Sequence, residues 1–154
     1  MAMTYLIQFF SNRVLITAGI AWLIAQMIKV ILTMITSRKF DFTRITGTGG
    51  MPSSHSAFTV ALATAIGFTD GFDSTLFAAA AAFSIVVMYD ATGIRRSAGQ
   101  QAVILNKIVD RLGKEDLSET GKRLKELLGH TPKQVFVGAF LGFAVAVIRH
   151  LILI

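Results

Sequence analysis

Residues 49–57, Gly-Gly-Met-Pro-Ser-Ser-His-Ser-Ala, place small residues, hydroxyls and a histidine where a long apolar helix is expected to begin. Pro52 suits the first turn of a helix, where its missing N–H leaves no bond unmade. Ser53 and Ser54 can cap the N–H groups of that turn, and such a helix start can bind an anion. His55 can give or take a proton near neutral pH. The stretch predicts an anion site with a proton donor beside it; the alternative is a helix N-terminus whose histidine is a polar cap.

Other side chains that could act on a phosphate stand near the ends of apolar segments. Lys29 lies near the end of the first segment, Asp90 closes the third with Arg95 and Arg96 after it, and His130 opens the fourth. Fixed cations and helix N–H groups suit a phosphate, whose charge is spread over its oxygens. One histidine can attack phosphorus, and a second can protonate the leaving oxygen.

Neither a metal nor another cofactor is expected. The chain has no cysteine, which excludes a thiolate nucleophile and a cysteine-based metal site. Asp90 is the only acidic residue near this face within the apolar segments, whereas a Mg²⁺ site is built from carboxylates and phosphates. The residues therefore predict phosphoryl transfer without a metal ion.

The composition is typical of a membrane protein. Of 154 residues, 53% are hydrophobic and 16% are charged, against about 25% charged in soluble domains. The length predicts one domain, residues 1–154. The net charge of +6 indicates cytoplasmic loops and anionic lipid headgroups as partners in preference to nucleic acid.

Four apolar segments approach the length of about 20 residues that crosses a bilayer. The expected spans are residues 14–35, 52–68, 74–92 and 132–148. Residues 1–12 either lie at the membrane interface or begin the first helix. The predicted fold is an all-α polytopic membrane helix bundle with four to five spans and an amphipathic cytoplasmic helical segment.

The amphipathic segment is the insertion at residues 97–130, where apolar residues recur at helical spacing among charges. It is expected to form two helices, broken at Gly113, that lie on the membrane surface or pack as a hairpin against the bundle. In the last span, Gly138 and Gly142 form a Gly-x-x-x-Gly pair, which is a weak signal of close helix packing.

Four spans place the loops at residues 37–51 and 93–131 on one side, and these loops hold most of the lysine and arginine. The positive-inside rule puts them in the cytoplasm and both termini outside. All the reactive residues named above fall at this end of a four-helix bundle, where sites are built from facing helices. We expect an integral protein of a bacterial cytoplasmic membrane whose active face is cytoplasmic.

The sequence resembles the divergent branch of the type 2 phosphatidic acid phosphatase superfamily, which is related to vanadium-dependent haloperoxidases. The resemblance covers nearly the whole chain. Its motifs are Ala25-Gln26-x-x-Lys29, Gly50-Met51-Pro52-Ser53-Ser54-His55-Ser56-Ala57, Asp90-Ala91-x-Gly93-x-Arg95-Arg96 and Leu127-Leu128-Gly129-His130-Thr131-Pro132. It implies that Lys29 and Ser53 bind phosphate, that His55 is the general acid and that His130 is the nucleophile.

The chain departs from the superfamily's pattern at several positions. Gln134 stands where an aspartate would orient the nucleophile, and an amide cannot stabilise an imidazolium by charge. Asp90 could take over that task, or it could be neutralised in an ion pair with Arg95 or Arg96. Ser54 replaces a glycine of the second motif.

The arginines of the superfamily's motifs have only poor counterparts here. Arg38 follows Lys29 at too long a spacing, and Arg123 is one residue too far from His130. Arg95 or Arg96 could replace them at the phosphate.

The implied function is a metal-independent phosphatase that acts on membrane lipid phosphates through a phosphohistidine. The alternative is a non-catalytic protein that binds anionic lipid or phosphate and keeps the fold. A transporter or channel subunit fits less well, because the polar residues gather at one face and do not cross the membrane.

Overall fold

The computed structural model describes residues 1–37, 50–112, 124 and 129–153, and every regular element in these ranges is an α-helix. This confirms the all-α class. The second helix expected within the amphipathic segment, after Gly113, lies outside the described residues, as does Arg38. The helices are α1 (Ala2–Phe10), α2 (Arg13–Ser37), α4 (Ser54–Asp70), α5 (Thr75–Thr92), α6 (Ile94–Leu112) and α7 (Pro132–Leu153).

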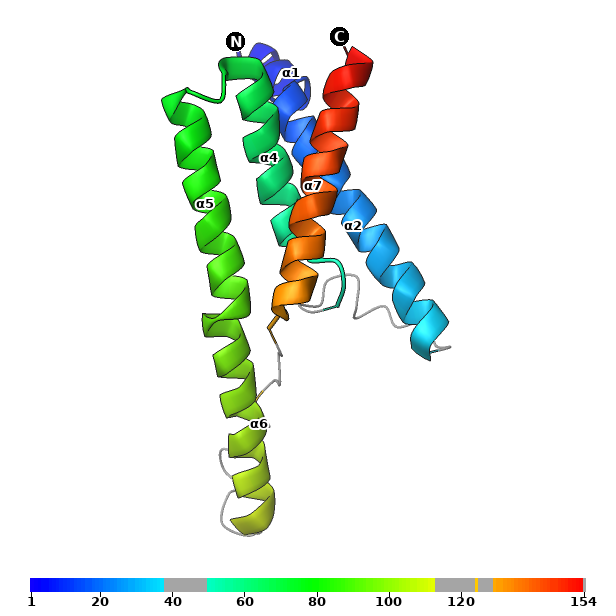
Figure 1. Ribbon diagram of the computed structural model, residues 1–154, viewed down its shortest axis with the longest axis vertical. Coiled ribbons are helices and arrows are strands. Elements are labelled where there is room, and N and C mark those ends of the chain that lie inside the picture. Colours follow the sequence, from blue (N-terminus) through cyan, green and yellow to red (C-terminus); the bar gives the residue numbers. More distant parts are fainter. Residues whose placement is uncertain (38–49, 113–123, 125–128, 154) are drawn as a thin grey trace.

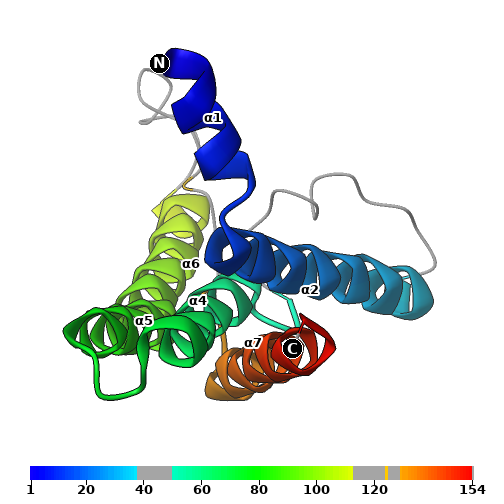
Figure 2. The same cartoon turned by 90° about the horizontal axis from the view of Figure 1, so that it is seen from above.

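The central helix of the bundle is α4, which packs against α2, α5 and α7 (Figure 2). In Figure 1, α2 runs away from the end that holds both termini, α4 returns, α5 leaves again and α7 comes back. The start of α4, the end of α5 and the start of α7 therefore meet at the end of the bundle opposite the termini.

Among the described residues, three helical stretches are long and apolar enough to cross a membrane: Arg13–Thr36, Thr75–Arg111 and Pro132–Leu153. Many of their outward side chains are apolar and exposed, as lipid contact requires. Four to five spans were predicted, and α4 is the one that falls short in length. With 17 residues it is at the lower limit of a crossing helix, and other helices rather than lipid surround it. The result is a polytopic membrane helix bundle.

Small residues let the helices around α4 approach closely. Ala57 and Ala61 of α4 are fully buried and form the core with Ala21, Ala25 and Ala146. Close backbone approach is the usual basis of helix association in lipid, where apolar burial gives no advantage.

The Gly-x-x-x-Gly pair is the contact face between α7 and α4. A Cβ at Gly138 would overlap the carbonyl oxygen of Ser53, and a Cβ at Gly142 would overlap that of Ala57. Glycine is therefore required at both positions for α7 to lie this close to the first turns of α4.

Residues 1–12 do not begin the first long helix. They form the separate helix α1, which projects from the bundle (Figure 2), and the Asn12 side chain caps α2. Its Oδ1 accepts hydrogen bonds from the N–H groups of Val14 and Leu15, at 3.0 and 3.1 Å. A position of α1 at the membrane interface stays a prediction.

The amphipathic segment starts as a continuation of α5. Helix α6 extends beyond the bundle nearly in line with α5 (Figure 1). Near its end, the Asn106 side-chain amide donates to the backbone carbonyl of Leu124 and accepts from its N–H, at 2.9 and 3.1 Å. Residue 124 thus lies beside α6, as in a hairpin.

Candidate functional site

Backbone contacts join the elements at the end of the bundle opposite the termini. The N–H of Ser53 donates to the carbonyl of Gln134 at 3.0 Å, and that of His130 donates to the carbonyl of Ala91 at 3.1 Å. A Cβ at Gly129 would overlap the backbone of Arg96. The starts of α4, α6 and α7 and the end of α5 are therefore held in fixed positions.

A cavity of about 540 Å³ lies among these elements. Four of the predicted site residues line it, namely His55, Asp90, Arg95 and His130. The remaining lining residues are small or apolar: Val86, Val87, Ala91, Ala98, Gly99 and Gly129. The part of this wall formed by Ala98 and Gly99 of α6 could not be recognised from the sequence, because these residues lie in a polar segment.

Among the polar and charged side chains that line the cavity, His130 is the buried one, with 5% of its surface exposed. Its Nε2 is shielded from solvent and has no hydrogen-bond partner among the described residues. An unpaired buried polar atom costs about 1–3 kcal/mol. A ligand that engages this nitrogen would recover that free energy.

Burial lowers the pKa of His130 to about 4, and the positive charges of Lys29, His55 and Arg95 contribute. The ring is therefore neutral at pH 7 and keeps a nitrogen lone pair. A neutral imidazole is the form that a nucleophile requires. The cavity wall brings His55 of α4 and Arg95 of α6 beside His130.

Lys29 reaches this cluster from α2 and is 3% exposed. Its stem lies against Gly50, where a Cβ would be 3.2 Å from the lysine Cγ. Gly50 has a φ of +87°, which glycine adopts readily. The alternative that Lys29 snorkels to the interface does not fit, because a snorkelling ammonium lies in water.

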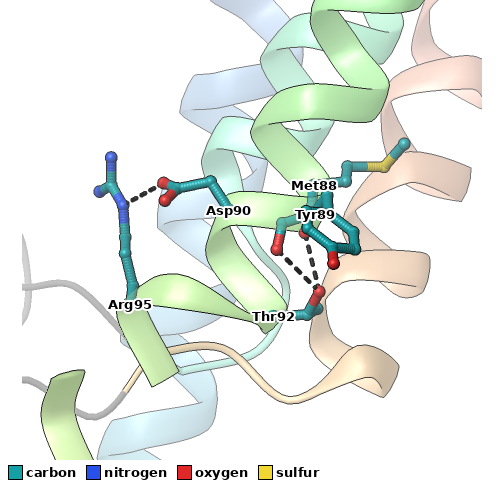
Figure 3. Close-up of polar contacts among 5 residues, drawn as sticks. All are labelled: Met88, Tyr89, Asp90, Thr92 and Arg95. Carbon is teal, nitrogen blue, oxygen red and sulfur yellow. Dashed lines mark hydrogen bonds and ion pairs between the residues drawn. The ribbon is translucent and has the colours of Figure 1, made fainter. Parts of the chain in front are cut away.

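Asp90 forms an ion pair with Arg95, whose Nε donates to the aspartate Oδ2 at 2.5 Å (Figure 3). The pair bridges the break between α5 and α6 at Gly93. The Thr92 hydroxyl stabilises the same turn by donating to the carbonyls of Met88 and Tyr89, as Figure 3 shows. Of the two roles considered for Asp90, the ion pair is the one present.

Arg96 does not line the cavity. Its backbone packs against Gly129 instead. Of the two neighbouring arginines, Arg95 is therefore the one that lines the cavity.

Ser53 and Ser54 are buried at the start of α4 and do not line the cavity. Ser53 is the N-cap, and its Oγ accepts hydrogen bonds from the N–H and the hydroxyl of Ser56, at 3.4 and 3.0 Å. The predicted cap is thus present. The prediction for Pro52 is wrong by two positions, because Pro52 precedes the N-cap and α4 begins at Ser54.

Gln134 caps its own helix. Its Oε1 accepts a hydrogen bond from the N–H of Thr131 at 2.9 Å, while its N–H approaches the Thr131 hydroxyl at 3.5 Å. This is the reciprocal capping box that the pattern Thr-x-x-Gln typically forms. Sequence reasoning missed this pattern and treated Gln134 only as a substitute for an orienting aspartate.

A second cavity, of about 380 Å³, adjoins the first and shares His55 and Val87 with it. The other lining residues come from α2, α4 and α5 and are mostly apolar: Gly19, Trp22, Phe58, Thr59 and Phe83. An apolar cavity between membrane helices suits a hydrocarbon chain.

No group of three His, Asp or Glu side chains among the described residues could hold a metal ion. Metal-independent chemistry stays a prediction.

The sequence was compared with protein families, curated proteins and solved structures. A family model described as "Divergent PAP2 family" matches residues 10–145. The chain is 42% identical over 151 residues to "Uncharacterized membrane protein YuiD" of Bacillus subtilis (strain 168), which covers 92% of this chain and 96% of that protein. No solved structure matches. The family match includes every residue that contributes to the His130 cluster.

Proposed function

The chain belongs to the divergent PAP2 family, and we propose that it is a metal-independent membrane lipid-phosphate phosphatase with His130 as nucleophile. One observation carries this proposal. Lys29, His55 and Arg95 converge on a buried, neutral His130 beside a cavity. Among the described lining residues, Asp90 alone is acidic, and Arg95 neutralises it. Lys29 adds a positive charge near His130 that no described carboxylate of the cavity wall balances, and such a charge favours an anionic substrate.

The proposed reaction has two steps. A ring nitrogen of His130 attacks phosphorus, so that a P–N bond forms and the P–O bond to the lipid breaks. Protonated His55 gives its proton to the departing oxygen, which leaves as the lipid alcohol. Water then attacks phosphorus and returns a proton to His55, while the P–N bond breaks and inorganic phosphate leaves. Lys29 and Arg95 stabilise the phosphoryl charge in both steps.

The remaining predicted residues position the members of this cluster and do not contact the substrate. Asp90 holds Arg95 by its Nε and leaves the other guanidinium nitrogens directed to phosphate. Ser53 and Ser54 fix the start of α4, which carries His55. Arg96 fixes the segment before α7 through its contact with Gly129.

The apolar cavity supports a lipid substrate over a soluble one. It adjoins the His130 cavity at His55 and lies among helices whose outer faces are apolar. We propose that a phosphomonoester or diphosphate lipid places its headgroup at His130 and its first methylenes in this second cavity.

Filling the apolar cavity is expected to weaken the binding of long-chain lipid substrates more than that of short-chain ones. A Cβ at Gly19 meets nothing within 4 Å, so Gly19→Leu should fold and occupy the space. Losing the burial of two or three methylenes, at about 0.8 kcal/mol each, should raise KM for long-chain phosphatidate roughly tenfold or more. KM for a short-chain, water-soluble phosphatidate should stay within about twofold. Steady-state kinetics in mixed micelles measure both.

The matched control for that experiment is Ile20→Leu, a change on the exposed surface next to Gly19. It should leave both KM values unchanged. An equal rise of KM for the short-chain and long-chain substrates in the Gly19→Leu protein would show that the cavity does not bind the lipid chain.

Phosphate release by the purified protein tests the function itself. The protein is reconstituted in phosphatidylcholine vesicles and offered phosphatidate, phosphatidylglycerophosphate and a polyprenyl diphosphate, with and without a metal chelator. Release that the chelator does not reduce is the expected result. Folded protein that binds these lipids competitively with phosphate and releases none would establish the non-catalytic alternative, which the use of Gln134 as a helix cap favours.

We also propose that the His130 cavity faces the cytoplasm. Most of the lysine and arginine falls in residues 37–51 and 93–131, which come between the helices whose ends meet at this cavity, and the positive-inside rule places such segments in the cytoplasm. The chain has no cysteine, so single cysteines are clean labels. In intact cells, a membrane-impermeant maleimide should react with Asp73→Cys and spare Ser97→Cys. The reverse pattern would place the cavity on the outer face.

A further inference from the structure

The end of the bundle that holds the termini contains another cavity, of about 230 Å³. Its lining residues belong to α2, α4 and α7. The ends of these helices near the termini lie opposite the start of α7 (Figure 1). Three basic side chains line it, namely Arg13, Arg149 and His150. The other lining residues are Val14, Thr17, Ala65, Phe68, Thr69, Ala146 and Leu153.

The arginines of this cavity have no counter-charge among the described residues. The Nη1 of Arg149 is shielded from solvent and has no hydrogen-bond partner among the described residues. Within the described part of the chain, Asp90 and Arg95 form the one ion pair, so neither Arg13 nor Arg149 has a described carboxylate partner. The ring of His150 stacks on Phe68, with centroids 4.0 Å apart and planes 6° from parallel.

Two ordinary roles of basic residues at a helix end do not account for Arg149. Such side chains often donate to the last carbonyls of their helix, but its Nη1 donates to no described acceptor. They also snorkel, which places the charged group in water or among headgroups, whereas this nitrogen is shielded. Burying a guanidinium N–H without a partner is costly, so a bound anion would be strongly stabilising.

We propose that this cavity binds a phosphate group at the membrane face opposite the His130 cavity. The guanidinium groups of Arg13 and Arg149 would hold the phosphate oxygens from two helices, since arginine recognises phosphate through paired N–H groups. The volume is below the roughly 300–1,000 Å³ of sites for drug-sized ligands. It therefore fits a headgroup phosphate or free phosphate, and not a whole lipid. The bound phosphate would join the start of α2 to the end of α7.

Binding to delipidated protein in neutral detergent tests this site. The probes are inorganic phosphate, phosphatidylglycerol and a diacylglycerol with the same chains, and native mass spectrometry and thermal unfolding are the readouts. All proteins carry Arg95→Gln, which weakens the His130 cavity and leaves the second site intact. Arg13→Gln and Arg149→Gln should each weaken phosphatidylglycerol binding about tenfold or more, because each removes a charged hydrogen bond. The diacylglycerol should not bind at this site.

The matched control is Arg111→Gln, which changes an exposed arginine of α6. Added to Arg95→Gln, it should leave phosphatidylglycerol binding unchanged. Binding of inorganic phosphate with the same loss in the Arg149 variant would identify free phosphate as a sufficient ligand. Binding of phosphatidylglycerol alone would identify the headgroup. If Arg149→Gln fails to fold, Arg149→Lys keeps the charge and loses the paired N–H groups, and it should still weaken binding. Unchanged binding in both Arg13→Gln and a folded Arg149 variant would overturn the site.

Discussion

Replacing His130 with alanine is expected to lower phosphate release from lipid phosphates by roughly 10³-fold or more, as loss of a nucleophile typically does. In the proposed reaction no other described group can form the covalent intermediate, since His55 is required as the acid. The side chain is buried, and its ring nitrogen has no described partner to lose. The fold should therefore tolerate the truncation, at the cost of a small cavity.

Two measurements check this result. The first is the rate of phosphate release from phosphatidate in vesicles. The second is trapping of a radiolabelled phosphoprotein at early times, whose label should be acid-labile and alkali-stable as a phosphoramidate is. The His130→Ala protein should show neither, and added imidazole should restore part of the release by occupying the vacated space.

Gln134→Glu is the matched control for His130→Ala. The capping box accepts glutamate in place of glutamine, so this variant should keep the start of α7 and full phosphate release. Turnover retained in folded His130→Ala protein would remove His130 from the nucleophile role. A large loss in the Gln134 variant would show that the residue acts on the reaction and not only on the helix.

The second large effect is expected from Gly142→Leu, which should prevent α7 from docking on α4. A Cβ alone would overlap the carbonyl oxygen of Ala57, and a backbone atom inside a helix cannot move aside as a flexible side chain can. Overpacking of cores typically costs about 1–3 kcal/mol, and this contact should exceed that range. Phosphate release should be lost together with the fold, because α7 positions His130.

Thermal unfolding in detergent, followed by circular dichroism, measures the effect of Gly142→Leu. Gly19→Leu is the control of equal side-chain volume, since a Cβ at Gly19 has open space, and its unfolding temperature should match that of the parent. The unfolding temperature of the Gly142→Ala protein should lie between those of the Gly142→Leu and Gly19→Leu proteins. A parent-like unfolding temperature in the Gly142→Leu protein would mean that α7 and α4 are not in close contact in the membrane.

The sequence was sufficient to predict the long helices and much of the His130 cluster. Apolar length and the positions of Pro132 and the serine caps predicted most helix ends to within a few residues. The motifs that lead into or out of the spans had to share one membrane face, so His55, Asp90, Arg95 and His130 could be placed together before any geometry was known.

Other features depend on packing and could not be read from spacing. The sequence left Asp90 with two possible roles, because the direction of a side chain at the end of α5 depends on how α6 begins. Ser53 and Ser54 are buried outside the cavity wall, and the backbone of Ser53 lies against Gly138 of α7. Gln134 is different, since the capping box was visible in the sequence and was overlooked.

The central place of α4 has a consequence for how the protein is made. This short helix is rich in alanine, serine and threonine, so on leaving the ribosome it has less reason to enter lipid than its neighbours. Helix α7 is synthesised after α4, and its Gly138 and Gly142 pack against the first turns of α4. His130 arrives with the same segment. The growing chain can therefore hold no complete His130 cluster before α7 packs against α4.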